Sequence, residues 1–297
     1  MERVFPNLFI AGVAKAGTTS MHSYLDQHPD ILMSSLKEPY YFAEDLNIPW
    51  KIRNLDDYLS LFYDRDNSVY CGESSPLYMY SKTAAAAISR YNPKARILVM
   101  LRNPVDFLWS LHGQYLYSGN EDVLDFESAL SLCGKRLLGH NVPELCHDPQ
   151  ILNYYELADF AVQLRRILSQ FPRDQIHVIK FDDFKENTLT VYSETLVFLG
   201  LQAYIPNLLH HNESKAIPNL FLRKFLSKIP RIRRCFHRLV PSRIASFFRN
   251  SLGRYTQRQR PKAMDKKLRA RLQEKLKPNV SELSCLLDMD FGSWTDN

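Results

Sequence analysis

The stretch L-F-I-A-G-V-A-K-A-G-T-T-S, residues 8–20, decides the fold of this chain of 297 residues. Its apolar start, cut short by Gly12, predicts a buried strand, and its final hydroxyl residues precede apolar residues at helical spacing. The segment therefore predicts a strand, a glycine-containing loop and the first turn of a helix. Backbone N–H groups of such a loop and the positive end of the helix dipole together bind an oxyanion. We expect a phosphate or sulfate group to bind here.

The loop differs from the Walker loop, which reads G-x-x-x-x-G-K-[ST] and has its lysine directly after the second glycine. Gly12 and Gly17 keep that spacing, but Thr18 takes the place of the lysine and Lys15 lies inside the loop. Because the cation is displaced, we expect an anion other than the β- and γ-phosphates of a nucleoside triphosphate. Glycine-containing turns from strand to helix also occur for packing alone, and this motif by itself leaves that alternative open.

The 45% of hydrophobic residues can form a substantial core, and the length allows one large α/β domain or two smaller ones, of which we favour one. The five cysteines are widely spaced and include no C-x-x-C pair, which indicates neither a disulfide framework nor a zinc ribbon. The loop begins within a dozen residues of Met1, and no apolar stretch reaches the roughly 18 residues of a membrane span. We expect a cytoplasmic protein without stable membrane insertion, or one whose leader has been removed.

The net charge of +6 is the sum of two parts of the chain with opposite net charges. Residues 215–277 carry 20 Lys and Arg against two acidic residues, a net charge of +18, and the remainder carries −12. Such a segment raises the hypothesis of nucleic-acid or membrane-surface binding, and residues 221–229 place several apolar side chains on one helical face. We favour a basic helical segment that packs its apolar side on the domain, because four prolines break the stretch into short pieces.

Further apolar runs alternate with helical patterns, as over residues 157–168, and predict a mostly parallel sheet covered by helices on both faces. Ligands bind such sheets at the carboxyl ends of the strands. Residues 119–150 contain scattered Gly, Pro and charged residues, and we interpret them as a surface insertion that could cover a substrate cleft. The runs expected as strands are Ile31–Met33, Val69–Cys71, Ile97–Leu101 and Ile176–Phe181.

A second candidate anion site follows the strand expected at Ile97–Leu101, where the sequence reads R-N-P-V-D-F-L-W-S. Arg102 at the carboxyl end of a strand can make two-pronged contacts to a phosphate, and Ser110, one or two turns into the next helix, can add a hydroxyl donor. An arginine after a strand is, by itself, more often part of a surface ion pair. Together with the first loop, it indicates a ligand that is phosphorylated at two places.

These motifs resemble the P-loop sulfotransferases that use 3′-phosphoadenosine 5′-phosphosulfate (PAPS). The 5′-phosphosulfate loop of that family is similar to K-x-G-T-T-S, which residues 15–20 match, and its 3′-phosphate motif is similar to R-x-P-x(5)-S, which residues 102–110 match. The resemblance is strongest to bacterial and heparan-type carbohydrate sulfotransferases. Shorter similarities run almost from end to end: H-P-D-I at 28–31, K-E-P-Y-Y-F at 37–42, G-E-S-S-P-L-Y at 72–78, F-P-R-D-Q-I-H-V-I-K-F-D-D-F at 171–184, and a basic helix that ends near 291–294.

The resemblance implies a single-domain α/β fold of the P-loop nucleotide-binding type over residues 1–297, with PAPS as co-substrate, adenosine 3′,5′-bisphosphate as product and no required metal. Negative charge develops on the bridging oxygen as the S–O bond opens, and a cation beside it stabilises the transition state more than the ground state. Lys15 is our candidate for that cation. The residues expected to bind the donor are Lys15, Ala16, Gly17, Thr18, Thr19 and Ser20 for the 5′-phosphosulfate, and Arg102 and Ser110 for the 3′-phosphate.

The resemblance also provides a candidate general base, because heparan-type enzymes use a glutamate in a K-E-x-x-F-F-like segment. Glu38 has the matching position in K-E-P-Y-Y-F, and the alternative is an exposed glutamate paired with Lys37. Steroid- and phenol-type relatives use a histidine between the two PAPS motifs, but residues 29–111 contain none. We interpret the flanking His28 and His112 as packing or supporting residues.

The chain departs from the carbohydrate enzymes in two places. Those enzymes often carry a lysine before an S-P or T-P dipeptide, where this chain has Ser74 after Glu73, so a second cation at the sulfuryl group is not implied there. Their C-terminal K-G-R loop is matched only in part by residues 253–255, which lack the lysine. The resemblance leaves Arg254 and Arg258 as alternatives for the second arginine at the 3′-phosphate.

Two other classes of function compete with this interpretation. A P-loop kinase would use residues 176–183 as a strand that ends in a magnesium-binding aspartate, but the Walker lysine is missing and Asp182 or Asp183 fits a helix N-cap. A basic nucleic-acid-binding module would explain residues 215–277, but no recognised binding motif supports it.

The predicted function is sulfuryl transfer to a hydroxyl group of a carbohydrate or small natural product, with an amine as the less favoured alternative. The acceptor is specified only by aromatic residues near the expected cleft, which suit sugar rings, phenols or a planar alkaloid alike: Tyr40, Tyr41, Phe42, Tyr78 and Tyr80.

Overall fold

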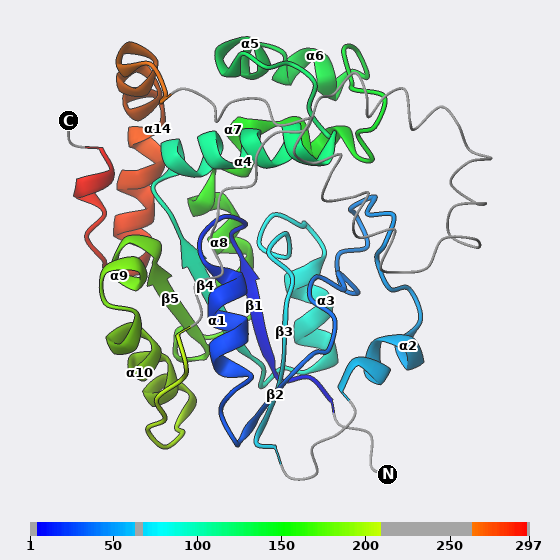
Figure 1. Ribbon diagram of the computed structural model, residues 1–297, viewed down its shortest axis with the longest axis vertical. Coiled ribbons are helices and arrows are strands. Elements are labelled where there is room, and N and C mark those ends of the chain that lie inside the picture. The colour runs from blue at the N-terminus through cyan, green and yellow to red at the C-terminus, as the bar shows by residue number, and fades with distance from the viewer. Residues whose placement is uncertain (1–4, 63–67, 209–262, 296–297) are drawn as a thin grey trace, which may run out of the picture.

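The structure is a computed structural model, and it describes residues 5–62, 68–208 and 263–295. A parallel sheet with the strand order β2-β3-β1-β4-β5 forms its centre (Figure 1). Most strand residues are buried apolar side chains, as expected of strands that helices cover on both faces. The predicted fold class is confirmed. The strands are β1 (Leu8–Gly12), β2 (Ile31–Met33), β3 (Tyr70–Ser74), β4 (Arg96–Leu101) and β5 (Ile176–Lys180).

Helices surround this sheet, and α1 lies in front of the strands in Figure 1. The helix α1 contacts β2 and β3, α9 and α10 contact β5, and α14 packs against α4 and α8. The helices are α1 (Thr18–Leu25), α2 (Leu55–Leu59), α3 (Ala84–Tyr91), α4 (Pro104–Ser118), α5 (Phe126–Ser131), α6 (Cys133–Leu137), α7 (Tyr154–Leu157), α8 (Phe160–Leu168), α9 (Phe181–Glu186), α10 (Thr188–Leu199) and α14 (Lys266–Leu287). Short 3₁₀ helices are η1 (Ser60–Phe62), η2 (Pro149–Leu152), η3 (Arg173–Gln175) and η4 (Gly292–Trp294).

The boundaries of α4 show how local sequence positions the second anion motif. The side chain of Asn103 caps the helix by accepting from the backbone N–H groups of Val105 and Asp106, and Pro104 takes the first helical position. The helix ends at Gly119, which has φ 85° and can adopt this left-handed conformation without strain. Arg102 therefore lies between the end of β4 and the start of α4.

Several predicted element boundaries were wrong, and two of them differ by a single residue: β3 begins at Tyr70 rather than Val69, and β4 begins at Arg96 rather than Ile97. The strand β3 continues to Ser74 rather than ending at Cys71, because Glu73 finds hydrogen-bond donors in the core. The strand β5 ends one residue before Phe181, which begins α9. The helical pattern of residues 157–168 forms two helices, because the side chain of Asp159 accepts from Val162 N–H and caps a new helix.

Residues 119–150 are more than a surface insertion. Glu121 and Arg136 form a bidentate ion pair with both contacts at 2.6 Å, and both side chains have an exposed fraction of 0%. The hydroxyl of Tyr154 in α7 donates to the same carboxylate at 2.9 Å. These hydrogen bonds offset the free-energy cost of removing the two charges from water. The segment therefore has a specific internal structure, and the hydroxyl of Tyr154 connects it to α7.

Most of the basic segment lies outside the described residues, including Arg254, Arg258 and the apolar pattern of residues 221–229. Its last part forms the first half of α14, where Leu272 and Leu276 are buried while the neighbouring lysines are exposed. This half of α14 is a basic helix that packs its apolar side against α4 and α8. None of the helices in the described part is apolar over a length that would cross a membrane.

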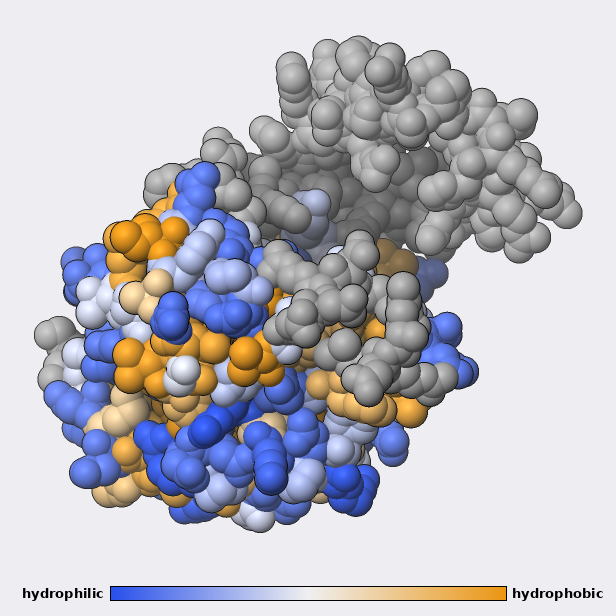
Figure 2. Space-filling view, turned by 90° about the horizontal axis from the view of Figure 1, so that it is seen from below, coloured by the Kyte–Doolittle hydropathy of each residue, from blue (hydrophilic) through white to orange (hydrophobic). Residues whose placement is uncertain are grey.

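Figure 2 views the molecule from the side at which the strands begin, and hydrophobic residues form several patches there between hydrophilic regions. Single exposed apolar side chains, such as Val197 at 77%, are ordinary on a protein surface.

Candidate active site

The anion loop, residues 12–20, connects the carboxyl end of β1 to the N-terminus of α1. Gly17 is the N-cap residue of α1 with φ 85°, and a Cβ at this position would lie 3.1 Å from the ring of Phe184. No described side chain caps this helix, and its first turn contains no acidic residue. The N-terminus of α1 therefore retains the positive potential that binds an anion.

A hydrogen bond joins the two predicted anion sites. Nη1 of Arg102 donates to the backbone oxygen of Lys15 at 2.9 Å, and Lys15 adopts φ 64° inside the loop. The guanidinium of Arg102 also lies over the ring of Phe181, 4.8 Å from its centroid. Burial lowers the pKa of Arg102, and the carboxylates of Asp106 and Asp182 oppose this shift, so the group keeps its charge.

Ser110 lies in the second turn of α4 and is partly buried, where the sequence places it. Because the strands β1 and β4 are hydrogen-bonded neighbours, the anion loop and the start of α4 leave the same edge of the sheet. The strand order thus brings together the two motifs that are about 85 residues apart in the chain.

Lys37 and Glu38 connect the end of β3 to the anion loop. The backbone N–H of Glu38 donates to the carbonyl of Ser74 at 2.9 Å, and Glu38 adopts φ 61°. Nζ of Lys37 donates to Oγ1 of Thr19 at 2.7 Å. The two side chains have different partners, so the alternative of a simple Lys37–Glu38 pair does not describe this segment. The candidate base lies directly beside a residue that contacts the loop.

The carboxylate of Glu38 accepts a hydrogen bond of 3.0 Å from the hydroxyl of Tyr40. Tyr40 is 3% exposed, and burial together with the charge of Glu38 raises its pKa well above the usual range. Its hydroxyl therefore stays protonated and acts as a donor. Sequence reasoning missed this role. The only signal for it in the sequence is that Glu38 and Tyr40 are two residues apart in K-E-P-Y.

The aromatic residues expected near the acceptor are mostly core residues, which corrects the prediction. Tyr40, Phe42, Tyr78 and Tyr80 are each less than 5% exposed. Tyr41 is partly buried and stacks on Tyr58, with ring centroids 4.6 Å apart. The pattern Y-Y-F belongs to an aromatic cluster of the core, because burial removes the large apolar surface of these rings from water.

Glu73 is a fully buried carboxyl group next to this cluster. It accepts hydrogen bonds from Tyr58, Ser75 and Tyr78 at 3.1, 2.6 and 2.6 Å. Burial raises the pKa of Glu73 to about 7, and the hydrogen bonds oppose the shift. Ser74 follows it, with an Oγ that has no hydrogen-bond partner among the described residues. The end of β3 is therefore rigid, and it provides the carbonyl that positions Glu38.

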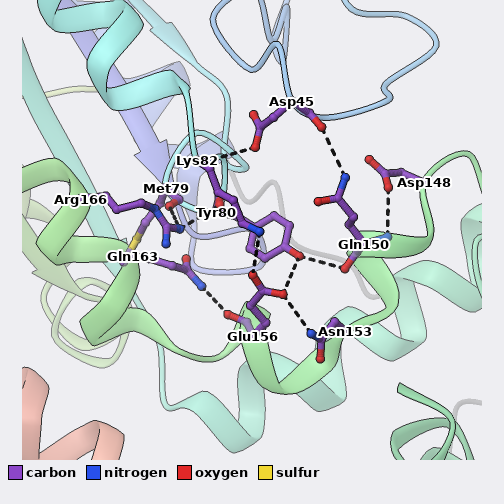
Figure 3. Close-up of polar contacts among 10 residues, drawn as sticks. All are labelled: Asp45, Met79, Tyr80, Lys82, Asp148, Gln150, Asn153, Glu156, Gln163 and Arg166. Atoms are coloured by element: carbon purple, nitrogen blue, oxygen red, sulfur yellow. Dashed lines mark hydrogen bonds and ion pairs between the residues drawn. The ribbon is translucent and has the colours of Figure 1, made fainter. Parts of the chain in front are cut away.

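A second polar cluster fixes the segment that follows Ser75-Pro76 (Figure 3). The hydroxyl of Tyr80 donates to the carbonyl of Gln150 at 3.0 Å, and Arg166 from α8 donates to the carbonyls of Met79 and Tyr80. Asp45 accepts from the backbone N–H of Lys82 at 2.8 Å. These bonds join residues 79–82 to η2, α8 and the loop after Glu38, and they hold the surroundings of the site in place.

Asp182 and Asp183 do not cap α9, so that prediction was wrong. The N-cap residue is Lys180, and both aspartates lie in the first turn. Asp182 accepts a hydrogen bond of 2.9 Å from Nε1 of Trp294, and Asp183 forms an ion pair with Lys180 at 3.4 Å. Asp182 thus anchors the C-terminal part of the chain to the sheet.

The two histidines that flank the site bond to the backbone. His28 and His112 are buried, and their Nε2 atoms lie 3.1 and 2.9 Å from the carbonyl oxygens of Gln202 and Val123. Both histidines are packing residues, as predicted. Within the described ranges, no three His, Cys, Asp or Glu side chains are grouped as metal ligands.

Comparison with known proteins identifies the family. Residues 5–277 match the sulfotransferase domain. Human carbohydrate sulfotransferase 15 is 25% identical over 251 residues, which cover 67% of this chain and 44% of that protein. Human bifunctional heparan sulfate N-deacetylase/N-sulfotransferase 2 is 25% identical over 207 residues, which cover 67% of this chain and 22% of that protein. The chain thus spans less than half the length of these two relatives.

The fold agrees with this result over the whole chain. The crystal structure of a sulfotransferase from Alicyclobacillus acidocaldarius has a TM-score of 0.74 and 25% identity, and the match covers 99% of this chain and 100% of that one. The family match, the relatives and the geometry of the two anion motifs agree with one another. The chain belongs to the sulfotransferase family.

Proposed function

We propose that this protein transfers the sulfuryl group of PAPS to a hydroxyl group of a carbohydrate or small natural-product acceptor, with an amine as the less favoured alternative to the hydroxyl. The observation that carries the proposal is the hydrogen bond between Arg102 and the backbone of Lys15, which joins two anion-binding motifs at neighbouring strand ends. The names of the relatives, which include carbohydrate and heparan sulfate enzymes, support a carbohydrate acceptor.

The donor set fits the two charged ends of PAPS. The uncapped N-terminus of α1 and the hydroxyl residues 18–20 suit the 5′-phosphosulfate, and Arg102 and Ser110 suit the 3′-phosphate. Thr18 and Ser20 are about 95% buried, so their positions are fixed before a ligand binds. Arg254 and Arg258 lie outside the described residues and remain alternatives for a further contact.

The chemistry requires a base and a cation. PAPS supplies an activated sulfuryl group, whose bond to the bridging oxygen breaks as a bond from sulfur to the acceptor oxygen forms. Glu38 takes the proton of the attacking hydroxyl, and Lys15 stabilises the charge that develops on the bridging oxygen. Tyr40 holds Glu38 in place from within the aromatic cluster.

Nothing in the structure or the comparisons supports the kinase alternative. Thr18 has the position that the Walker lysine would take. The carboxylate of Asp182, a candidate magnesium ligand of a kinase, accepts a hydrogen bond from Nε1 of Trp294 instead. The basic segment that suggested nucleic-acid binding lies mostly outside the described residues.

Calorimetry with adenosine 3′,5′-bisphosphate tests donor binding without knowledge of the acceptor. The wild-type protein should bind it, and Arg102→Ala should weaken binding by about tenfold or more because a charged two-pronged contact is lost. Turnover should then be detected with radiolabelled PAPS and extracts of the host's metabolites and glycans, with the labelled product identified by mass. Absence of bisphosphate binding, or phosphorylation from ATP instead, would overturn the proposal.

A further inference from the structure

Lys37 is a partly buried cation that faces the anion loop. Its Nζ donates to Oγ1 of Thr19 at 2.7 Å, and none of the ion pairs between described residues includes it. The carboxylate of the adjacent Glu38 is bonded to Tyr40 instead. Burial lowers the pKa of Lys37, and the charge of Glu38 opposes this shift. The position thus holds a partly desolvated ammonium without a paired carboxylate.

Such a cation is costly to keep unless an anion approaches it. Thr19 is the second residue of α1, so Lys37 contacts the helix at the end that binds anions. An ammonium has three N–H donors, and only one of them is needed for Thr19. The others can reach oxygen atoms of a group bound at the loop.

The backbone contact that places Lys37 at the end of β3 does not involve Lys15. Glu38 N–H is bonded to the carbonyl of Ser74, the last residue of β3, and this bond holds the preceding residue beside the strand end. Ser74 itself is uncharged, with a buried Oγ that has no partner among the described residues. Lys37 on the neighbouring loop therefore brings positive charge to this strand end.

We propose that Lys37 contacts the 5′-phosphosulfate of the donor and acts as a second cation in addition to Lys15. This inference rests on the proposed function, and it adds a catalytic residue that the sequence motifs did not identify. Lys37 directly precedes Glu38, so the same segment binds the donor and presents the base. Donor binding and alignment of the base are thereby coupled through one peptide bond.

Two nucleotides that differ only in the 5′-phosphate test this role without an acceptor. Adenosine 3′,5′-bisphosphate carries the group that Lys37 should contact, and adenosine 3′-monophosphate lacks it. We expect Lys37→Met to weaken binding of the bisphosphate by about tenfold to a hundredfold and binding of the monophosphate by less than about twofold. Lys37→Arg should restore most of the affinity for the bisphosphate.

Lys82→Met is the matched control, because it also removes one lysine charge. The side chain of Lys82 is 61% exposed, and its ion-pair partner, 3.7 Å away, is Glu156 of α7 rather than a residue of the anion loop. Its binding constants for both nucleotides should equal those of the wild type. Arg102→Ala, in contrast, should weaken both nucleotides, since both carry the 3′-phosphate.

The outcomes separate this inference from the proposed function. If the wild type does not bind the bisphosphate, the proposed function fails. If the wild type binds it but Lys37→Met binds it equally well, or loses both nucleotides to the same degree, only the role of Lys37 fails. Thermal unfolding of each variant checks the fold, and Lys37→Gln replaces Lys37→Met if the latter does not fold.

Discussion

The hydroxyl of Tyr40 donates a hydrogen bond of 3.0 Å to Oε2 of Glu38. Tyr40 is also held by its backbone, whose N–H donates to Oγ of Ser75 at 3.1 Å. Ser75 in turn donates to the buried carboxyl group of Glu73 at 2.6 Å. The candidate base is thereby positioned by a chain of contacts that begins inside the core.

Replacing Tyr40 by phenylalanine should lower kcat by about tenfold and leave the KM for PAPS unchanged, because only the orientation of Glu38 is affected. Steady-state kinetics with the acceptor found in the labelled-donor screen measure both constants. Tyr80→Phe is the control, since it removes a buried hydroxyl that donates to Gln150 instead. An equal loss of kcat in both variants would show that Tyr40 acts only through general stability.

Lys15→Ala and Glu38→Gln should each reduce kcat by about a hundredfold or more while the protein folds normally. The first removes charge stabilisation of the bridging oxygen, and the second removes the base. Turnover is measured under saturating donor, and circular dichroism checks the fold. Rates near that of the wild type in either variant would contradict the role assigned to that residue.

Arg136→Met should lower the free energy of unfolding by about 3–5 kcal/mol, because it leaves the buried carboxylate of Glu121 without its cation. Urea denaturation measures the change. Arg271→Met removes an exposed pair with Glu127, with exposed fractions of 63% and 55%, and should change stability by less than about 1 kcal/mol. Similar effects of both substitutions would argue against a specific internal structure of residues 119–150.

The pH dependence of stability should report the burial of Glu73. Its pKa is raised from 4.5 to about 7 in the folded protein, so the folded state binds the proton more tightly than the unfolded state does. Between these two values the contribution of Glu73 to stability falls as the pH rises, by about 3 kcal/mol in total, and above about pH 7 the loss is complete. Unfolding of the wild type and Glu73→Gln across pH 4 to 8 isolates this contribution. An identical pH profile for the two proteins would contradict it.

Local patterns were sufficient to predict the sheet and the two anion motifs. The apolar runs gave four further strands in addition to β1, and the glycine and hydroxyl residues after β1 placed the start of α1. Predicted element boundaries were wrong where the hydrogen bonds of one side chain determine where a helix or strand begins or ends. Asp159 divided a helical pattern by capping, and Glu73 extended a strand because three hydroxyl groups surround it.

The supporting contacts of the site could not be predicted, because they join residues that are distant in the chain. Lys37 and Thr19 are 18 residues apart, and Arg102 and Lys15 are 87 apart. The aromatic residues after Glu38 carry no local signal that separates a core ring from a ligand-binding ring. Their burial depends on how β3 and the following loop close over them.

Arg102 is bonded to the main-chain oxygen of Lys15, not to its side chain. A residue that tolerates φ 64° at position 15 therefore supplies the same acceptor, and this hydrogen bond does not depend on which side chain projects from the loop. The side chain at this position can be exchanged during evolution or protein engineering while the contact between the two motifs persists. The charge at position 15 and the link between the loop and the start of α4 are, in this architecture, separately adjustable properties.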